Sequence, residues 1–261
     1  MTSEAGFSYP PTRSFPSVNI LGVRVDAVDR QSILRIAAAW AQQEQPRTIA
    51  YANAHCLNLA YKDEVYRTIL NASDMLTADG IGVVWAGRVL TGIQLFKVTS
   101  RTFIDDLCEI AASQNLKLYI LAGVPGVAER AVKIIQARHA GLVIAGYCDG
   151  FFSMKNEADI LDEINDSRPH ILLAGMGAPR QEKWIKRNRE LIHVPLCWGL
   201  GAVFDYVAGV EPVVPGWLEH IGLEWLWRLM VNPRDKWRRY LIGNPLFFFR
   251  VLLQKYSVKY K

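Results

Sequence analysis

Apolar and polar residues follow two different rhythms along the chain, and these rhythms predict most of its secondary structure. Residues 18–28 alternate between apolar and polar side chains, which predicts a short strand or one arm of a hairpin. Residues 29–43 carry apolar side chains at helical spacing behind Asp29, which is a suitable N-cap. The next predicted elements are a strand over 47–54, a helix over 55–73, a short strand and turn over 74–82 and a short helix over 81–90.

From residue 100 onward, predicted helices and strands alternate regularly. The predicted helices cover 100–115, 124–140, 156–167 and 179–191, and the predicted strands cover 116–123, 142–150, 170–177 and 194–204. Alternation at this spacing favours an α/β fold, a parallel sheet with helices on both faces. In open sheets of this kind, ligands bind at the carboxyl ends of the strands.

The pattern changes at residue 212, where Pro212, Pro215 and Gly216 interrupt the chain. The residues beyond are rich in tryptophan and arginine, and we expect two helical pieces punctuated by Asn-Pro at 232–233 and 244–245. The sequence therefore predicts a flexible leader (1–17), a core of alternating strands and helices (18–211) and a helical C-terminal appendage (212–261).

Charge is distributed unevenly between these parts. Residues 228–261 hold nine lysines and arginines against one aspartate, a net charge of +8, whereas the rest of the chain holds 21 basic and 24 acidic residues. Such asymmetry indicates an anionic partner: a membrane surface, a nucleic acid or a phosphate. The four cysteines form no CxxC pair, so neither a zinc site nor a disulfide framework is expected, and a reducing cytoplasmic compartment fits. Neither a signal peptide nor a transmembrane helix is expected.

Several polar residues follow predicted strands, and each has a structural and a functional interpretation. Asp79, between Ala78 and Gly80, is either a helix cap or a base at the mouth of a pocket. Asn53 ends a strand and could contact a ligand hydroxyl, although turn-forming asparagines are common. Gln181 and Asp205 each follow a glycine-containing turn (176–178 and 199–201), where a ligand can approach the backbone, but each also fits an ordinary helix start. Neither turn matches a P-loop or a dinucleotide fingerprint.

The basic appendage also allows more than one function. Its arginines Arg228, Arg234, Arg238 and Arg239 could clamp a diphosphate. Aromatic residues interleave with the arginines, which suits a helix at the depth of lipid headgroups. A nucleic-acid surface is the competing interpretation. The neighbouring apolar runs at 246–249 and 251–254 favour lipid over a nucleic acid.

Five segments, read in order, resemble the WecG/TagA/CpsF family of bacterial glycosyltransferases, glycosyltransferase family 26. They are NAHCLNLAYKD, ASDMLTADGIGVVWAGRVL, GMGAPRQEKWI, GLGAVFDYVAG and GLEWLWRLMVNPRDKWRRYLIGNPLFFFRVL. The resemblance covers residues 18–253. It implies a Rossmann-like core with a membrane-contacting appendage, and an inverting, metal-independent transfer without cofactor. The implied donor is a UDP-sugar and the implied acceptor a polyprenyl-diphosphate-linked saccharide, at the cytoplasmic face of the membrane.

The resemblance also implies roles for individual residues. Asp79 matches the family's candidate general base, and Asn53, Gln181 and Asp205 match positions that look like donor-binding residues. Arg228, Arg234, Arg238 and Arg239 match arginines that stabilise the leaving diphosphate. Tyr51 departs from the pattern, because the family often has threonine there, which puts a hydroxyl contact to the donor in doubt.

Two other classes of function remain as alternatives. A dinucleotide-dependent oxidoreductase would need a full GxGxxG with a ribose-binding acid, which the chain lacks. A non-enzymatic nucleotide- or nucleic-acid-binding module would not depend on Asp79. The sequence leaves open homo-oligomerisation, the donor sugar (glucose, N-acetylmannosamine or its uronic acid) and the polymer, whether exopolysaccharide or another envelope glycan.

Overall fold

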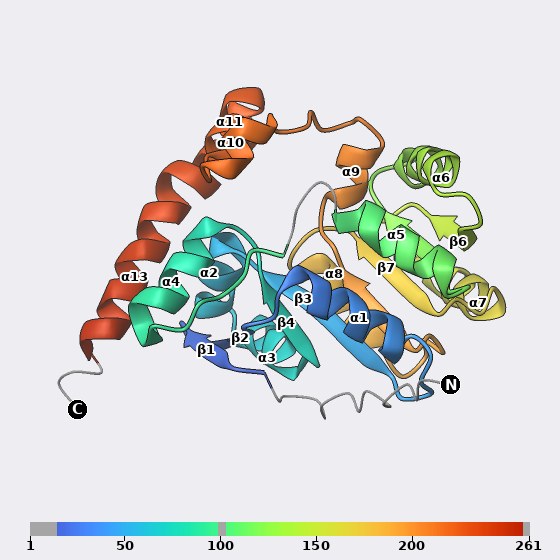
Figure 1. The fold of residues 1–261 in the computed structure, drawn as a ribbon, viewed down its shortest axis with the longest axis horizontal. Helices are drawn as coiled ribbons and strands as arrows, with labels where there is room; N and C mark the ends of the chain where they lie inside the picture. The colour runs from blue at the N-terminus through green and yellow to red at the C-terminus, as the bar shows by residue number, and fades with distance from the viewer. Residues whose placement is uncertain (1–14, 99–102, 258–261) are drawn as a thin grey trace, which may run out of the picture.

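The computed structural model describes residues 15–98 and 103–257, and its centre is a single eight-stranded sheet (Figure 1). The strands are β1 (Ser17–Ile20), β2 (Val23–Asp26), β3 (Arg47–Ala52), β4 (Met75–Ala78), β5 (Lys117–Ala122), β6 (Val143–Cys148), β7 (Ile171–Gly175) and β8 (Leu196–Gly199). Their order is β1-β2-β4-β3-β8-β7-β5-β6. All neighbouring pairs are parallel except β1 and β2, which form an antiparallel hairpin. The predicted α/β class is confirmed, and the sheet is mostly rather than wholly parallel.

Helices cover both faces of the sheet, as the alternation of strands and helices predicts. The core helices are α1 (Arg30–Trp40), α2 (Ala54–Lys62), α3 (Glu64–Ala72), α4 (Ile81–Thr91), α5 (Phe103–Ser113), α6 (Val127–Arg138), α7 (Glu157–Asp166), α8 (Arg180–Asn188) and α9 (Val203–Val207), with a 3-10 turn at Met154–Asn156. Successive residues of β7 point to opposite faces, so Leu173 packs with α1, α5 and α6, and Leu172 packs with α7 and α8. A third cluster joins α2, α3 and α4 to β3 and β4.

Two predicted elements differ from the structure at positions where a side chain or a glycine ends them. The single helix expected over 55–73 is two helices, because Asp63 ends α2 and caps α3, accepting a hydrogen bond from Tyr66 N at 2.9 Å. The strand expected over 194–204 ends at Gly199, and the chain then turns through Gly201, which has a φ of +63°. Residues from Val203 onward belong to α9.

The appendage is helical, but its helices do not divide as expected. It contains α10 (Gly216–His220), α11 (Glu224–Val231), α12 (Pro233–Trp237), the π-helical segment η2 (Arg238–Gly243) and α13 (Asn244–Ser257). Asn232–Pro233 separates α11 from α12 as predicted, whereas Asn244–Pro245 does not interrupt the helix. The wider π turns directly precede Pro245, whose missing N–H cannot join the regular i→i−4 ladder.

The appendage returns along the chain's first half and packs against it. In Figure 1, α13 runs beside α4 and α2, far from α9, where the core ends. Phe247 and Val251 are fully buried among the residues of α2, α4 and the first strands. Asn58 of α2 donates to Gly243 O at 2.7 Å and accepts from Arg250 Nη1 at 2.7 Å. None of the described helices is both long enough and apolar enough to span a bilayer.

Candidate active site

Asp79 lies at the carboxyl end of β4, in the centre of the candidate site. Its backbone N–H donates to Ala52 O at 2.9 Å, which extends the pairing of β3 with β4 by one residue. Gly80 follows with a φ of +86° and is the N-cap of α4. The helix-cap interpretation of Asp79 is therefore wrong, because the capping position belongs to Gly80.

Asn53 holds the Asp79 carboxylate from the end of the neighbouring strand. Its side-chain Oδ1 accepts from Cys56 N at 3.0 Å and caps α2, and its Nδ2 donates to Asp79 Oδ2 at 3.2 Å. Asn53 is 9% exposed, so this amide is fixed by both contacts. One asparagine thus ends β3, begins α2 and orients the acid.

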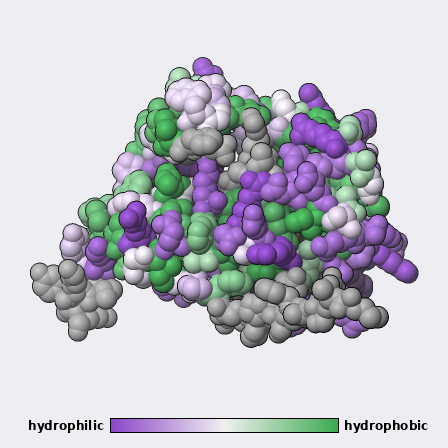
Figure 2. Space-filling view, viewed as in Figure 1, coloured by the Kyte–Doolittle hydropathy of each residue, from purple (hydrophilic) through white to green (hydrophobic). Residues whose placement is uncertain are grey.

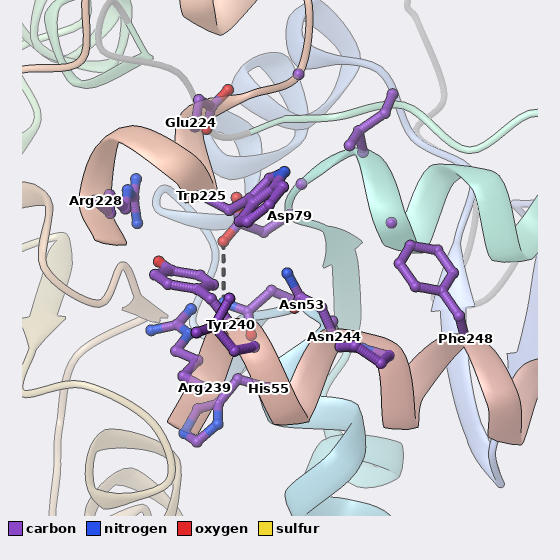
Figure 3. Close-up of a pocket in the computed structure, with 17 residues that line it drawn as sticks. Asn53, His55, Asp79, Glu224, Trp225, Arg228, Arg239, Tyr240, Asn244 and Phe248 are labelled. Atoms are coloured by element: carbon purple, nitrogen blue, oxygen red, sulfur yellow. Dashed lines mark hydrogen bonds between the residues drawn. The ribbon is translucent and has the colours of Figure 1, made fainter. Parts of the chain in front are cut away.

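A cavity of about 370 Å³ opens around Asp79, between the core and the appendage (Figure 3). The core contributes Asn53, Ala54, His55, Asp79, Gly80, Ile81 and Gly82, and the appendage contributes Gly222, Glu224, Trp225, Arg228, Arg239, Tyr240, Leu241, Asn244, Pro245 and Phe248. The cavity exists only where α11, η2 and α13 face α2 and α4. The appendage therefore completes the pocket that surrounds Asp79.

Two of the four predicted arginines line this cavity. Figure 3 shows Arg228 and Arg239 on one side of Asp79 and Phe248 on the other. Arg228 stacks over the Tyr206 ring of α9, 5.1 Å from its centroid, and its buried Nε has no hydrogen-bond partner among the described residues. Burial lowers the pKa of Arg228, but neighbouring groups, Tyr206 and Asp79 among them, outweigh burial and raise the pKa above its ordinary value. The site thus holds a permanent cation close to the carboxylate.

The other two predicted arginines do not line the cavity. Arg234 and Arg238 are exposed on the outer side of the appendage, and Arg238 stacks on the Trp237 ring at 5.4 Å. Arg238 and Arg239 are adjacent in η2, so successive side chains point to different sides of the helix. The structure therefore separates a cavity-facing pair from a solvent-facing pair.

Some cavity residues carry no clear sequence signal. His55 lies two positions after Asn53, and burial together with the positive charges of Arg239 and Lys236 lowers its pKa to about 4. It is therefore uncharged at neutral pH. Glu224 also lines the cavity and forms an ion pair with Lys97, which continues the sheet beside Ala78. Only the docking of the appendage brings Glu224 to this place.

Gln181 and Asp205 lie outside the cavity around Asp79. Gln181 is fully buried at the start of α8, where its Oε1 accepts from Gly201 N at 3.0 Å. Asp205 is partly buried in α9, and burial and Glu211 raise its pKa, against the opposing charge of Lys236. Gln181 and Asp205 come after the carboxyl ends of β7 and β8, whereas Asn53 and Asp79 come directly after the carboxyl ends of β3 and β4.

Tyr51 and the loop after β8 meet at the topological switch point of the sheet. The chain passes from β3 through α2 and α3 to β4, whereas β8 is followed by α9, which packs against α6 away from α2 (Figure 1). In open sheets of this kind, ligands usually bind at the carboxyl ends of adjacent strands whose connections diverge. Tyr51 on β3, Gly199 at the end of β8 and Gly201 just after it lie at this edge of the sheet.

The fold and the site together define an α/β protein with a cavity at the carboxyl edge of a mostly parallel sheet. The chain belongs to the glycosyl transferase WecG/TagA/CpsF family, whose profile matches residues 18–261. It is 26% identical over 220 residues to the N-acetylglucosaminyldiphosphoundecaprenol N-acetyl-beta-D-mannosaminyltransferase of Bacillus subtilis (strain 168), covering 84% of each chain. It is 26% identical over 246 residues to the enzyme of that name from Staphylococcus aureus (strain NCTC 8325), covering 93% of this chain and 94% of the relative.

Proposed function

We propose that this protein transfers a sugar from a UDP-sugar to a polyprenyl-diphosphate-linked saccharide, with inversion at the anomeric carbon. The observation that carries the proposal is the Asp79 carboxylate, held by Asn53 in a cavity that the arginine-bearing appendage closes. The names of the relatives describe an acceptor with a lipid diphosphate and a mannosaminyl donor group. At 26% identity, the class of acceptor is the part of those names that we carry over, and the donor sugar stays open.

The proposed reaction uses Asp79 as the general base. The acceptor hydroxyl gives its proton to the Asp79 carboxylate as its oxygen forms a bond to the anomeric carbon. The bond from that carbon to the donor diphosphate breaks on the opposite face, and UDP leaves with the electron pair. Arg228 and Arg239, on one side of Asp79, stabilise the negative charge that develops on this diphosphate, so the proposal needs no metal ion. We propose that the nucleotide binds at the carboxyl ends of β3 and β8, near Asn53, the Gln181-supported loop and Asp205.

We also propose that the appendage rests on an anionic membrane surface at its cytoplasmic face. Apolar side chains are exposed along its helices, including Trp217, Leu241, Phe249 and Leu253. Figure 2 shows apolar and hydrophilic residues mixed over the flank where α13 lies. Arg234 and Arg238 face outward on the same appendage, which suits binding to anionic headgroups.

The first experiment is a transfer assay with a panel of UDP-sugars, a short-chain lipid-diphosphate saccharide and EDTA. We expect transfer by the wild type from one donor and a loss of roughly a hundredfold or more in Asp79→Asn, as for other missing general bases. Asp166→Asn, which changes an exposed aspartate of α7, is the matched control and should retain full activity. Undiminished transfer by Asp79→Asn would contradict the role of Asp79, and loss of transfer in EDTA would contradict metal independence.

The two pairs of arginines allow separate tests of chemistry and membrane binding. Arg228→Lys should lower kcat by about tenfold or more, because lysine keeps the charge but loses the planar donor geometry. Arg234→Glu with Arg238→Glu should instead weaken sedimentation with anionic lipid vesicles and leave kcat on a soluble acceptor unchanged. The control is Arg138→Glu, an exposed arginine of α6. If the Arg234→Glu/Arg238→Glu double variant binds vesicles as well as Arg138→Glu does, the membrane proposal is contradicted.

A further inference from the structure

Glu182 is a buried carboxylate that the proposed reaction does not use. It lies on α8 and is 4% exposed. Its Oε1 accepts from Gln181 Nε2 at 2.6 Å, and its Oε2 accepts from Tyr66 Oη at 3.4 Å. Among the described residues no cation forms an ion pair with it, and burial raises its pKa to about 7. Burying a carboxyl group without an ion pair costs stability. An apolar residue would avoid this cost, so the hydrogen bonds of Glu182 call for a functional explanation.

The carboxylate fixes which way the Gln181 amide points. The Gln181 NH₂ donates to Glu182 Oε1, which therefore faces this end of the amide. The Gly201 N–H can only donate, so the Gln181 carbonyl oxygen must face the loop after β8, where it accepts at 3.0 Å. Gln181 is fully buried, so both ends of its amide are determined inside the protein.

The loop that Gln181 holds has almost no room to move. A Cβ on Gly199 would lie 2.8 Å from Gln181 Nε2, and a Cβ on Gly201 would lie 2.4 Å from Tyr51 Oη. Backbone and side chains therefore fit together here only because both positions are glycine. This loop follows the carboxyl end of β8, and Tyr51 and Asn53 lie at the carboxyl end of the neighbouring strand β3.

We propose that Glu182 is a positioning residue, which acts through the Gln181 amide to hold the β8–α9 loop in the shape that the nucleotide-sugar donor requires. The expected effect of Glu182 on transfer rests on the proposed function, whereas its expected effect on the β8–α9 loop does not. Glu182 holds the loop through its hydrogen-bond acceptor and not through its negative charge. Gln181 thereby has an indirect role in donor binding, because its carbonyl oxygen and one N–H are already used within the protein.

The test compares Glu182→Gln with Glu182→Met. Glutamine still offers an oxygen to the Gln181 NH₂, whereas methionine fills a similar volume without an acceptor, so the Gln181 amide loses one of the two hydrogen bonds that hold it. We expect Glu182→Gln to keep kcat/KM within about threefold of the wild type. Glu182→Met should lower kcat/KM by about tenfold or more, with a higher KM for the donor and an unchanged KM for the acceptor. Its midpoint of urea unfolding should be no lower than that of the wild type, because methionine removes a buried ionisable group.

Hydrogen exchange supplies a readout that needs no substrate. In Glu182→Met the amide of Gly201 should exchange roughly tenfold faster, as expected for the loss of one buried hydrogen bond. Tyr66→Phe is the matched control, because it removes the contact to the other carboxylate oxygen and leaves the Gln181 contact in place. It should change neither exchange at Gly201 nor the donor KM by more than about threefold.

The outcomes separate this inference from the proposed function. Wild-type exchange and transfer in Glu182→Met would overturn the inference, as would an equal loss in Glu182→Gln, which would show that charge is what matters. An equal loss in Tyr66→Phe would also overturn it, because the effect would then spread through packing. Faster exchange at Gly201 without transfer by the wild type from any donor would count against the proposed function while leaving the role of Glu182 in the loop supported.

Discussion

Gly201 is a position where a single added methyl group should lower stability, because both its backbone conformation and its neighbour Tyr51 exclude one. Its φ is +63°, and a Cβ there would lie 2.4 Å from Tyr51 Oη and 3.0 Å from Tyr51 Cζ. Left-handed backbone costs alanine about 1–2 kcal/mol, and overpacking adds about 1–3 kcal/mol. We therefore expect Gly201→Ala to lower the free energy of unfolding by about 2–5 kcal/mol.

Gly177 provides a matched control for the backbone part of this cost. Its φ is +77°, but no described atom lies within 4 Å of a Cβ built there. Gly177→Ala should therefore cost only the backbone contribution, about 1–2 kcal/mol. Urea unfolding of both variants, compared at equal m values, isolates the crowding against Tyr51. Equal losses at Gly201 and Gly177 would refute the argument.

Tyr51→Phe extends this test to the contact itself. Without the hydroxyl, the nearest atom to the new methyl group is the ring carbon at 3.0 Å. Gly201→Ala should then cost about 1 kcal/mol less in the Tyr51→Phe background than in the wild type, a coupling that a double-mutant cycle measures. If the two costs are equal, the Tyr51 hydroxyl does not determine the glycine at 201.

Three further predictions concern the appendage and the candidate site. Phe247→Ala, which empties a fully buried position of α13, should lower the free energy of unfolding by about 3–5 kcal/mol in urea unfolding, and a loss below about 1 kcal/mol would show that α13 is not docked. His55 has a pKa of about 4 in the folded protein against 6.5 when unfolded, so its contribution to stability is complete above pH 6.5 and is lost as the pH falls toward 4. Between pH 7 and 4.5 the wild type should lose about 2 kcal/mol more than His55→Gln, and parallel pH profiles would contradict this. Asn53→Asp should preserve the cap of α2, lower the free energy of unfolding at neutral pH by about 1 kcal/mol or more, and shift the acid limb of transfer activity to higher pH, because two facing carboxylates resist joint ionisation and each pKa unit is worth about 1.4 kcal/mol; an unshifted pH profile would contradict the contact.

The sequence predicts the fold well where local chemistry and hydrophobic spacing agree. The cap at Asp29 and the alternation of strands and helices after residue 100 are confirmed, and the strand or hairpin arm expected over 18–28 is a complete hairpin of two short strands. The errors fall where one side chain changes the backbone without changing the hydrophobic pattern. Asp63 divides a continuous helical pattern because its carboxylate competes for the backbone N–H of Tyr66, and Gly199 ends a strand whose apolar pattern continues.

The candidate site is predictable only in its core half. Asn53 and Asp79 follow adjacent parallel strands, so their proximity follows from strand order once β3 and β4 pair. The sequence does not predict that Arg239 lines the cavity while Arg238 does not. That difference depends on the rotation of η2, which lies more than 150 residues after Asp79 in the sequence and docks beside it. A charge pattern identifies the basic appendage, but only tertiary packing decides which of its arginines reach the cavity.

This division has a thermodynamic consequence for the site. Asp79 comes from the core, whereas Arg228 and Arg239 come from the appendage, so a ligand that contacts both parts binds only the docked arrangement. Mass action then requires the ligand to stabilise docking, by about 2.7 kcal/mol at a hundred times its Kd. The buried Phe247 and Val251 already hold α13 in place without ligand. Docking through apolar contacts thus brings the arginines to the carboxylate before substrate arrives, so their placement need not be supplied by the substrate's own binding energy.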